Sequence, residues 1–265
     1  MRTQVDGNEV FYGTGSGAPA DDARTLIFVH GAGFDHTIWV MPARYFARHG
    51  WRVVAVDLPA HGRSQGAALT SIEQLADWLA RLIDTVSPNQ RASVVGHSMG
   101  SLVAMCAASR YSGKVELLAL LGTSAPMPVA DVLLNAAKDN DQAAIDMTNT
   151  WSHSVGGSLG SSENPGLSNL ALGERLLQQA GPGVFYADLT ACNNFKADAL
   201  ELIEQPTLVL IGDEDRMTPA RAGLAVVDAL HNVQQRRLPG CGHSMLSEQP
   251  NQVLDELAAF LPFAP

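Results

Sequence analysis

The sequence predicts an α/β fold in which a mostly parallel sheet is flanked by helices and carries an inserted helical cap. Short apolar runs rich in β-branched residues alternate with longer amphipathic runs, which is typical of parallel strands joined by helices. The alternation stops between about residues 126 and 202 and resumes at Pro206. We therefore assign residues 1–125 and 203–265 to one core and residues 126–202 to an inserted cap.

The core elements are predicted in order from the period of their apolar residues. A hairpin over residues 3–5 and 9–12 leads the chain. Short runs bounded by Gly, Pro or Asp predict strands over Thr25–Val29, Arg52–Val56, Ala92–Val95, Val115–Leu120, Thr207–Ile211 and Val233–Leu238. Helices are expected over Trp39–His49, Ile72–Val86, Ser98–Ser109, Arg221–Leu230 and Gln252–Phe260. In the helix at 72–86, apolar residues recur at steps of three and four, so one face should lie against the sheet.

The predicted cap contains helical segments and no strand-like run. Four helices are expected, over Val129–Lys138, Gln142–Trp151, Leu170–Ala180 and Phe185–Asn193. Because the segment interrupts the alternation of strands and helices without starting a new one, we interpret it as an insertion and not as a separate domain.

Composition excludes several classes of function. Seventeen basic against twenty-seven acidic side chains give a net charge of −10, so neither nucleic acid nor an anionic membrane surface is an expected partner. An apolar fraction of 46% is too high for intrinsic disorder. The three cysteines contain no C-x-x-C pair, which predicts neither a disulfide framework nor a zinc site. No secretory signal and no membrane-spanning run is visible, so we expect a cytoplasmic protein with no membrane span.

The most informative motif is Gly96-His97-Ser98-Met99-Gly100, which lies between an expected strand and an expected helix. Glycines at this spacing permit the sharp strand-to-helix turn of a nucleophile elbow, which raises a serine hydroxyl above the sheet. A serine hydroxyl is a weak nucleophile at neutral pH and needs a base, which a third group orients. Ser98 is therefore the candidate nucleophile, and an exposed serine in a glycine-flanked turn is the alternative.

An acid and then a histidine are expected after such a serine. Asp215 lies in the loop after the strand at 207–211, where active-site groups collect in an open α/β sheet, and Asp213 is the second choice. His243 follows the expected strand at 233–238 and is the candidate base. His231 ends a predicted helix, where a surface capping role explains it better.

The loop His30-Gly31-Ala32-Gly33 is a candidate oxyanion site, because it follows the first core strand directly. Backbone N–H groups in a tight glycine loop can stabilise an oxyanion, and the expected donors are the amides of Ala32 and Met99. A glycine-rich loop at this place also fits dinucleotide binding, but the G-x-G-x-x-G pattern is absent.

Together these residues resemble the α/β-hydrolase fold superfamily in its capped, esterase-like branch. The resemblance is carried, in family order, by residues 30–33, 57–64, 96–100, 206–215 and 242–243. It implies an α/β-hydrolase fold and a Ser98, Asp215 and His243 triad that forms an acyl-enzyme. It also implies a structural role for the loop Asp57–Ser64.

Departures from related branches narrow the resemblance. Serine at position 98, where haloalkane dehalogenases and epoxide hydrolases carry aspartate, argues against both of those branches. The elbow also lacks the Gly-Gly-Ser-Trp-Gly form of proline iminopeptidases. No H-E-x-x-H motif or cluster of metal-ligating residues is present in the sequence, so neither a metal nor a cofactor is expected.

The substrate must be selected by the cap and by the loops above the elbow. Apolar side chains there predict a largely apolar pocket for a small-molecule ester: Phe34, Met127, Trp151, Met217, Met245 and Leu246. Two of them, Met127 and Trp151, can equally pack the cap on the core. We expect cleavage of short- to medium-chain or aromatic, largely uncharged carboxylic esters.

Other activities on the same triad stay open at this point. A carbon–carbon bond hydrolase and a cofactor-free haloperoxidase or perhydrolase would use the same three residues. A non-enzymatic ligand receptor on this fold would retain them while hydrolysing very slowly. The oligomeric state does not follow from the sequence.

Overall fold

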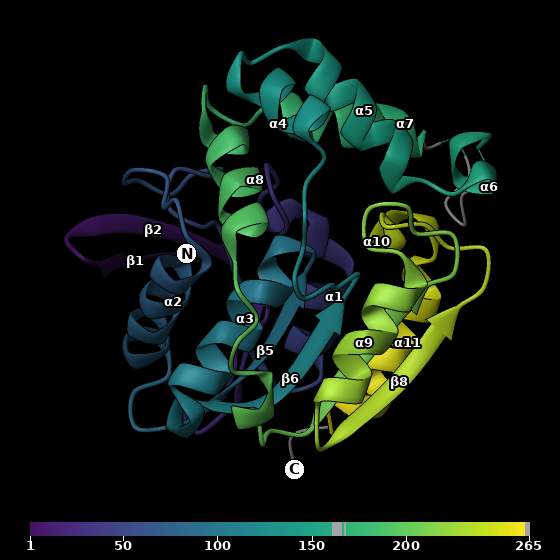
Figure 1. Cartoon of the computed structure of the whole chain (residues 1–265). Coiled ribbons are helices and arrows are strands. Elements are labelled where there is room, and N and C mark those ends of the chain that lie inside the picture. The colour runs from purple at the N-terminus through teal and green to yellow at the C-terminus, as the bar shows by residue number, and fades with distance from the viewer. Residues whose placement is uncertain (161–165, 167, 263–265) are drawn as a thin grey trace.

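A computed structural model describes residues 1–160, 166 and 168–262, and a twisted sheet forms its centre (Figure 1). Within these residues the sheet has eight strands in the order β1-β2-β4-β3-β5-β6-β7-β8. Their bounds are β1 (Arg2–Val5), β2 (Asn8–Gly13), β3 (Thr25–Val29), β4 (Arg52–Val56), β5 (Ala92–His97), β6 (Val115–Leu121), β7 (Thr207–Gly212) and β8 (Val233–Leu238). The first two strands pair antiparallel, and the strands from β3 to β8 run parallel. This confirms the predicted fold class.

Helices cover both faces of the sheet, which explains why its central strands are continuous apolar runs. On one face pack α2 (Ile72–Val86), α3 (Met99–Arg110) and α9 (Ala220–Ala229). On the other face pack α1 (Val40–Arg48) and α11 (Pro250–Phe260). Every residue of β3, β5 and β7 is buried between these layers.

The boundaries differ from the prediction at two places that matter for the site. Strand β5 continues to His97, two residues beyond the predicted end, so it runs directly into the turn at Ser98. The helix expected from Trp39 starts earlier as a 3₁₀ turn, η1 (His36–Trp39), because Asp35 caps it by accepting a hydrogen bond from the Thr37 N–H. Two further 3₁₀ turns, η2 (Ser112–Lys114) and η3 (Leu200–Leu202), and the short helix α10 (Met245–Glu248) were not predicted.

Five helices occupy the region predicted as an insertion, and we call them the cap. They are α4 (Asp131–Lys138), α5 (Gln142–Ser152), α6 (Val155–Ser158), α7 (Asn169–Gln178) and α8 (Val184–Asn194). Figure 1 shows α4, α5, α6 and α7 lying above the core, while α8 descends toward α3. The described residues between 126 and 202 contain no strand. None of the described helices combines the length and apolar character needed to cross a bilayer.

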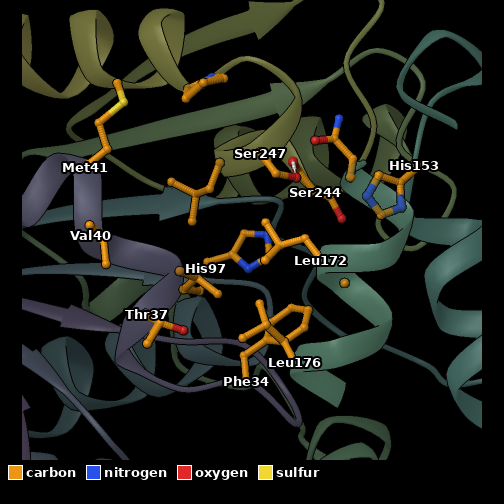
Figure 2. A pocket seen from close by; sticks show the side chains of 15 residues that line it. Phe34, Thr37, Val40, Met41, His97, His153, Leu172, Leu176, Ser244 and Ser247 are labelled. Carbon is orange, nitrogen blue, oxygen red and sulfur yellow. Dashed lines mark hydrogen bonds between the residues drawn. The ribbon is translucent and has the colours of Figure 1, made fainter. Parts of the chain in front are cut away.

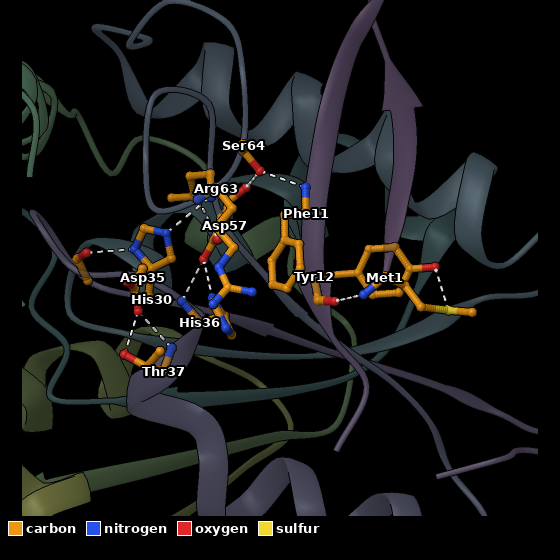
Figure 3. Close-up of polar contacts among 12 residues, drawn as sticks. Met1, Phe11, Tyr12, His30, Asp35, His36, Thr37, Asp57, Arg63 and Ser64 are labelled. Carbon is orange, nitrogen blue, oxygen red and sulfur yellow. Dashed lines mark hydrogen bonds and ion pairs between the residues drawn. The ribbon is translucent and has the colours of Figure 1, made fainter. Parts of the chain in front are cut away.

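Asp57, at the end of β4, fastens the following loop to the start of the chain (Figure 3). Its carboxylate accepts hydrogen bonds from the N–H groups of His36 and Arg63, at 2.7 and 2.9 Å. The hydroxyl of Ser64 donates to the Asp57 carbonyl and accepts from the Phe11 N–H. The carboxylate of Asp57 therefore joins the loop after β3 to the loop after β4, and its backbone carbonyl joins the latter loop to β2 through Ser64.

Two glycines allow β5 and α3 to approach the neighbouring backbone at the elbow. A Cβ atom on Gly96 would lie 2.2 Å from the Gly100 carbonyl oxygen, and one on Gly100 would lie 2.2 Å from the Val29 carbonyl oxygen. Both distances are far below contact distance, and backbone atoms cannot move aside as a flexible side chain can. The elbow requires glycine at these positions for close approach.

We expect Gly96→Ala to lower the free energy of unfolding by about 1–3 kcal/mol, because the added methyl group overpacks rigid backbone. Denaturant titration monitored by circular dichroism measures the change. Gly113→Ala is the matched control, because Gly113 is exposed and a Cβ there meets no atom within 4 Å. Equal stability of the two variants would contradict the close approach.

Candidate active site

Ser98 occupies the turn between β5 and α3 in a backbone conformation that serine rarely adopts. Its φ is +53° and its ψ is −121°, outside the regions favoured by residues with a side chain. The turn is held by the Ser98 N–H, which donates to the Leu121 carbonyl at 2.9 Å, and by Ser101, which donates to the Ser98 carbonyl. Such strained residues persist where the surroundings fix them, and they concentrate at functional sites.

His243 and Asp215 form a buried pair above the same edge of the sheet. His243 Nδ1 donates to Asp215 Oδ2 at 2.8 Å, and the two side chains are 5% and 1% exposed. They follow β8 and β7, which are parallel neighbours, so their loops leave the sheet side by side. Asp213, the second choice for the acid, instead pairs with Arg237 at 2.7 Å away from this histidine.

The environment of Asp215 keeps it ionised. Burial alone would raise the pKa of its carboxyl group, but the adjacent His243 and the hydrogen bonds from Thr218 outweigh burial and lower the pKa below its usual value. A carboxylate only accepts hydrogen bonds, so the proton of the pair lies on Nδ1 of His243. The other ring nitrogen, Nε2, then keeps the lone pair that a general base needs.

Two residues that support this pair were missed by the sequence analysis. The Thr218 hydroxyl donates to Asp215 Oδ2 at 2.6 Å, and its N–H donates to Oδ1 at 2.7 Å. Gly122 has φ of +56°, and a Cβ there would lie 3.0 Å from His243 Nδ1. Gly122 follows β6 directly, so its position at the carboxyl end of a core strand was the signal that could have found it.

His97 supports the backbone of the candidate base. Its Nε2 donates to the His243 carbonyl at 2.9 Å, and its ring is buried. Burial, and next the neighbouring His243, lower the pKa of His97 to about 3, so its ring is neutral. His97 therefore holds the loop of His243 in place without carrying charge.

The loop after β3 lies against the elbow. A Cβ atom on Gly31 would be 3.1 Å from the Cβ atom of Ser98, which is tighter than an ordinary contact, so glycine lets the loop lie close to the elbow without a shift. Within the described part of the chain, the N–H groups of Ala32 and Met99 have no hydrogen-bond partner. Met99 is also the first residue of α3, where backbone N–H groups and the helix dipole favour negative charge.

Ser98 and His243 line the same cleft, which has a volume of about 170 Å³ and extends under the cap. Ala32 lines it as well. Four of the predicted substrate residues also lie here, namely Phe34, Met127, Trp151 and Met217. The only charged side chain that lines this cleft within the described residues is Arg216, whose guanidinium donates to the carbonyls of Thr150 and His153.

A second cleft of about 370 Å³ lies between α7, α10 and the start of α1 (Figure 2). Phe34 lines both clefts, and Leu246 lines this larger one. None of its lining residues within the described chain is an Asp, Glu, Lys or Arg. Met245, which we expected in the pocket, lines neither cleft, because α10 turns its side chain into the core formed with α1 and α11.

One group of side chains in the described residues has ligand atoms close enough for a metal ion. Atoms of Asp35, His36 and Asp57 lie within 4.8 Å of one another. Asp57 Oδ1 already accepts from both the N–H and Nδ1 of His36 at 2.7 Å, and Asp35 Oδ1 accepts from Thr37 (Figure 3). Asp57 Oδ1, His36 Nδ1 and Asp35 Oδ1 are therefore already engaged in hydrogen bonds within the protein.

The chain is similar to a known protein family and to several characterised proteins. The sequence profile of the alpha/beta hydrolase family matches residues 26–256. A 2-hydroxy-6-oxononadienedioate/2-hydroxy-6-oxononatrienedioate hydrolase from Burkholderia vietnamiensis is 30% identical over 259 residues, which cover 90% of this chain and 86% of that protein. A pimeloyl-[acyl-carrier protein] methyl ester esterase from Aromatoleum aromaticum is 29% identical over 241 residues, 85% of this chain and 93% of the relative. The enol-lactonase from Burkholderia xenovorans LB400 has the same fold, with a TM-score of 0.86 at 20% identity over 98% of this chain and 99% of that one.

We expect Thr218→Val to lower the free energy of unfolding at neutral pH by about 1.5–3 kcal/mol, the usual contribution of a hydrogen bond to a charged group. A carboxyl group with a depressed pKa contributes stability above its unfolded pKa and loses it as the pH falls through the folded value. The difference from the unmodified protein should therefore shrink in acid. Denaturant titrations between pH 7 and pH 3 measure it.

Thr85→Val is the control for this experiment, because the exposed Thr85 hydroxyl donates only to the Arg81 carbonyl. A pH-independent difference for Thr218→Val would show that its hydroxyl does not stabilise the ionised Asp215.

Proposed function

Because the chain belongs to the alpha/beta hydrolase family, we propose that it is a serine hydrolase that cleaves carboxylic esters. Ser98, His243 and Asp215 are its nucleophile, base and orienting acid. The observation that carries the proposal is the buried 2.8 Å pair of His243 Nδ1 and Asp215 Oδ2, in one cleft with a serine held at positive φ. A structural role would not need a serine in that conformation.

The first half of the reaction acylates the serine. His243 removes the proton of Ser98 Oγ while this oxygen attacks the ester carbonyl carbon. The negative charge moves to the carbonyl oxygen, which accepts hydrogen bonds from the N–H groups of Ala32 and Met99. When the tetrahedral intermediate collapses, the bond to the alcohol oxygen breaks, and His243 gives its proton to the leaving alcohol.

The second half hydrolyses the acyl-enzyme. His243 removes a proton from water as the water attacks the acyl carbonyl, and the proton returns to Ser98 Oγ when the acid leaves. Asp215 stays ionised throughout. It holds the ring of His243 in the tautomer that faces Ser98 with a lone pair and stabilises the imidazolium form.

The lining of the two clefts supports uncharged substrates. The cleft of Ser98 is small, at about 170 Å³, whereas small-molecule sites usually span about 300–1,000 Å³. We place the reacting ester group there and a larger apolar group of the substrate in the adjoining cleft beyond Phe34. Because that cleft has no charged side chain among its described lining residues, it favours alkyl or aromatic groups.

Carbon–carbon bond hydrolysis is the second candidate, because two relatives at 28% and 30% identity are named as hydrolases of dienedioates. A dienedioate carries two carboxylates and needs cationic partners. Arg216 is the sole cation that lines the nucleophile's cleft in the described residues, and its guanidinium is already bonded to two backbone carbonyls. This favours ester cleavage over cleavage of a dianion.

We expect Ser98→Ala to lower kcat for p-nitrophenyl esters by a factor on the order of 10⁶, by analogy with removal of a nucleophile from other triads. A fluorophosphonate probe should label Ser98 in the unmodified protein and nothing in the variant. Ser109→Ala is the control, because Ser109 lies at the far end of α3 and donates to the Cys106 carbonyl. Near-normal turnover by Ser98→Ala would overturn the triad, and stoichiometric ligand binding without turnover would indicate a receptor.

We expect Leu172→Trp to reduce kcat/KM for esters with long or aromatic groups about tenfold and to leave acetate esters unchanged, because the indole fills the larger cleft. An ester series of increasing chain length measures the effect. Leu159→Trp, at a cap leucine that is 84% exposed, is the control. An equal reduction of kcat/KM for esters of every chain length would show that the larger cleft does not bind the substrate's long or aromatic group.

A further inference from the structure

A buried carboxylate on the cap reaches the candidate oxyanion loop. Asp188 lies on α8, and its Oδ2 accepts from the Gly33 N–H at 2.8 Å and from His61 Nε2 at 2.8 Å. The side chains of His61 and Asp188 are 2% and 1% exposed. His61 in turn donates through Nδ1 to the Pro59 carbonyl at 2.9 Å. We call Asp188, His61 and Gly33 the cap clasp, because it joins the cap to two loops of the core.

The cap also covers Gly33 sterically. Gly33 has φ of +69°, and a Cβ atom there would lie 2.9 Å from the ring of Phe185 and 3.0 Å from Leu177. Phe185 precedes Asp188 by three residues on α8, so both side chains lie on the same face of that helix. One turn of α8 therefore contacts Gly33 in two ways: Phe185 packs against it, and Asp188 accepts a hydrogen bond from its N–H.

We propose that Asp188 and His61 are positioning residues that set the Ala32 N–H for the oxyanion, so that docking of the cap and assembly of the oxyanion site are one event. The Gly33 N–H belongs to the peptide unit that follows Ala32, so its bond to Asp188 fixes that unit. The Ala32 N–H lies one peptide unit earlier, and fixing the unit after Ala32 limits the backbone rotations that could turn this N–H away. Neither Asp188 nor His61 lines the cleft of Ser98. The inference rests on the proposed function, because it assigns these residues a role in the same reaction.

The hydrogen bonds of the clasp fit a charged histidine. Both ring nitrogens of His61 face acceptors, a carbonyl and a carboxylate, so both carry a proton. Burial, the largest influence, lowers the pKa of His61, but Asp188, the Pro59 carbonyl and Asp57 together outweigh burial and raise this pKa above its usual value.

The other ionisable groups around His61 do not oppose this charge. Asp57, which ends β4, also raises the pKa of His61. The ring of His30 lies 4.8 Å away, between ring centres, and burial lowers its pKa to about 3, so it is neutral. His36 is bonded to Asp57. The raised pKa of His61 therefore favours the ion-paired form of the clasp, which weakens as the pH rises through that pKa.

The decisive variants are Asp188→Ala and Asp188→Asn. Asp188→Ala should lower kcat for an ester up to about 100-fold with little change in KM, because a displaced oxyanion donor weakens transition-state binding and not substrate binding. Asp188→Asn keeps an amide oxygen for the Gly33 N–H, so its kcat at neutral pH should fall only about 3- to 10-fold. Asp146→Asn, on the exposed face of α5, is the matched control and should leave kcat unchanged.

The pH profile distinguishes positioning from general stability. In Asp188→Asn the clasp has no ion pair to lose, so the ratio of kcat between the unmodified protein and this variant should shrink as His61 deprotonates in the unmodified protein. If Asp188 had a purely structural role, Asp188→Asn would lower the unfolding temperature and the amount of active protein, but the ratio of kcat values would not change with pH. Because asparagine matches aspartate in size, this measurement also stands if Asp188→Ala fails to fold.

Two outcomes overturn the proposals separately. Unchanged kcat in Asp188→Ala, or a pH-independent ratio for Asp188→Asn, would overturn the positioning role while leaving ester hydrolysis by Ser98 intact. Absence of both hydrolysis and fluorophosphonate labelling in the unmodified protein would overturn the proposed function and the positioning role with it.

Discussion

Burial of the Asp215 carboxylate is the constraint on which the rest of the candidate site depends. A buried charge is costly unless donors surround it, and here His243, Thr218 and the Met217 N–H provide them. Met217 and Thr218 fix the loop after β7, to which Asp215 itself belongs, and His243 ties the loop after β8 to it. The adjacent strands β7 and β8 bring these loops to one edge, and Gly122 leaves space for the pair at the end of β6. The position of His243 relative to Ser98 therefore follows from how one negative charge is satisfied.

Buried carboxylates also decide where the cap lies. Glu248 accepts hydrogen bonds from the N–H and hydroxyl of Ser154 in the cap and from the Gly242 N–H beside the candidate base. At the opposite side of the cleft, Asp188 holds the loop of Gly33. The cap is thus tied to the loop of the candidate base through Glu248 and to the loop of the candidate oxyanion donor Ala32 through Asp188. Because a half-satisfied buried carboxylate is strongly destabilising, movement of the cap and distortion of the site are energetically coupled.

The sequence predicts what depends on local patterns and misses what depends on contacts between distant segments. Continuous apolar runs predict the central strands, and the glycines around Ser98 predict the elbow, because each needs only a few neighbouring residues. The bonds from Gly33 and from His61 to Asp188 join positions 155 and 127 residues apart, so no local period indicates them. Met245 was expected in the pocket but lies in the core, again because its position does not follow from a local pattern. The four-residue helix α10 is too short to show a helical period, yet it decides which way the Met245 side chain points.

The lining of the two clefts and the net negative charge of the chain both bear on which substrates the site accepts. The ester hydrolysis that we propose converts a neutral substrate into a carboxylate, and the chain carries a net charge of −10. Neither cleft offers this product a free cation within the described residues, because the one arginine present is bonded to backbone carbonyls. In that reaction the negative field of the protein would repel the acid as it forms, whereas an uncharged ester would enter without opposition. A substrate that starts with two carboxylates would meet that repulsion before the reaction, which is why the linings favour neutral esters over dianions.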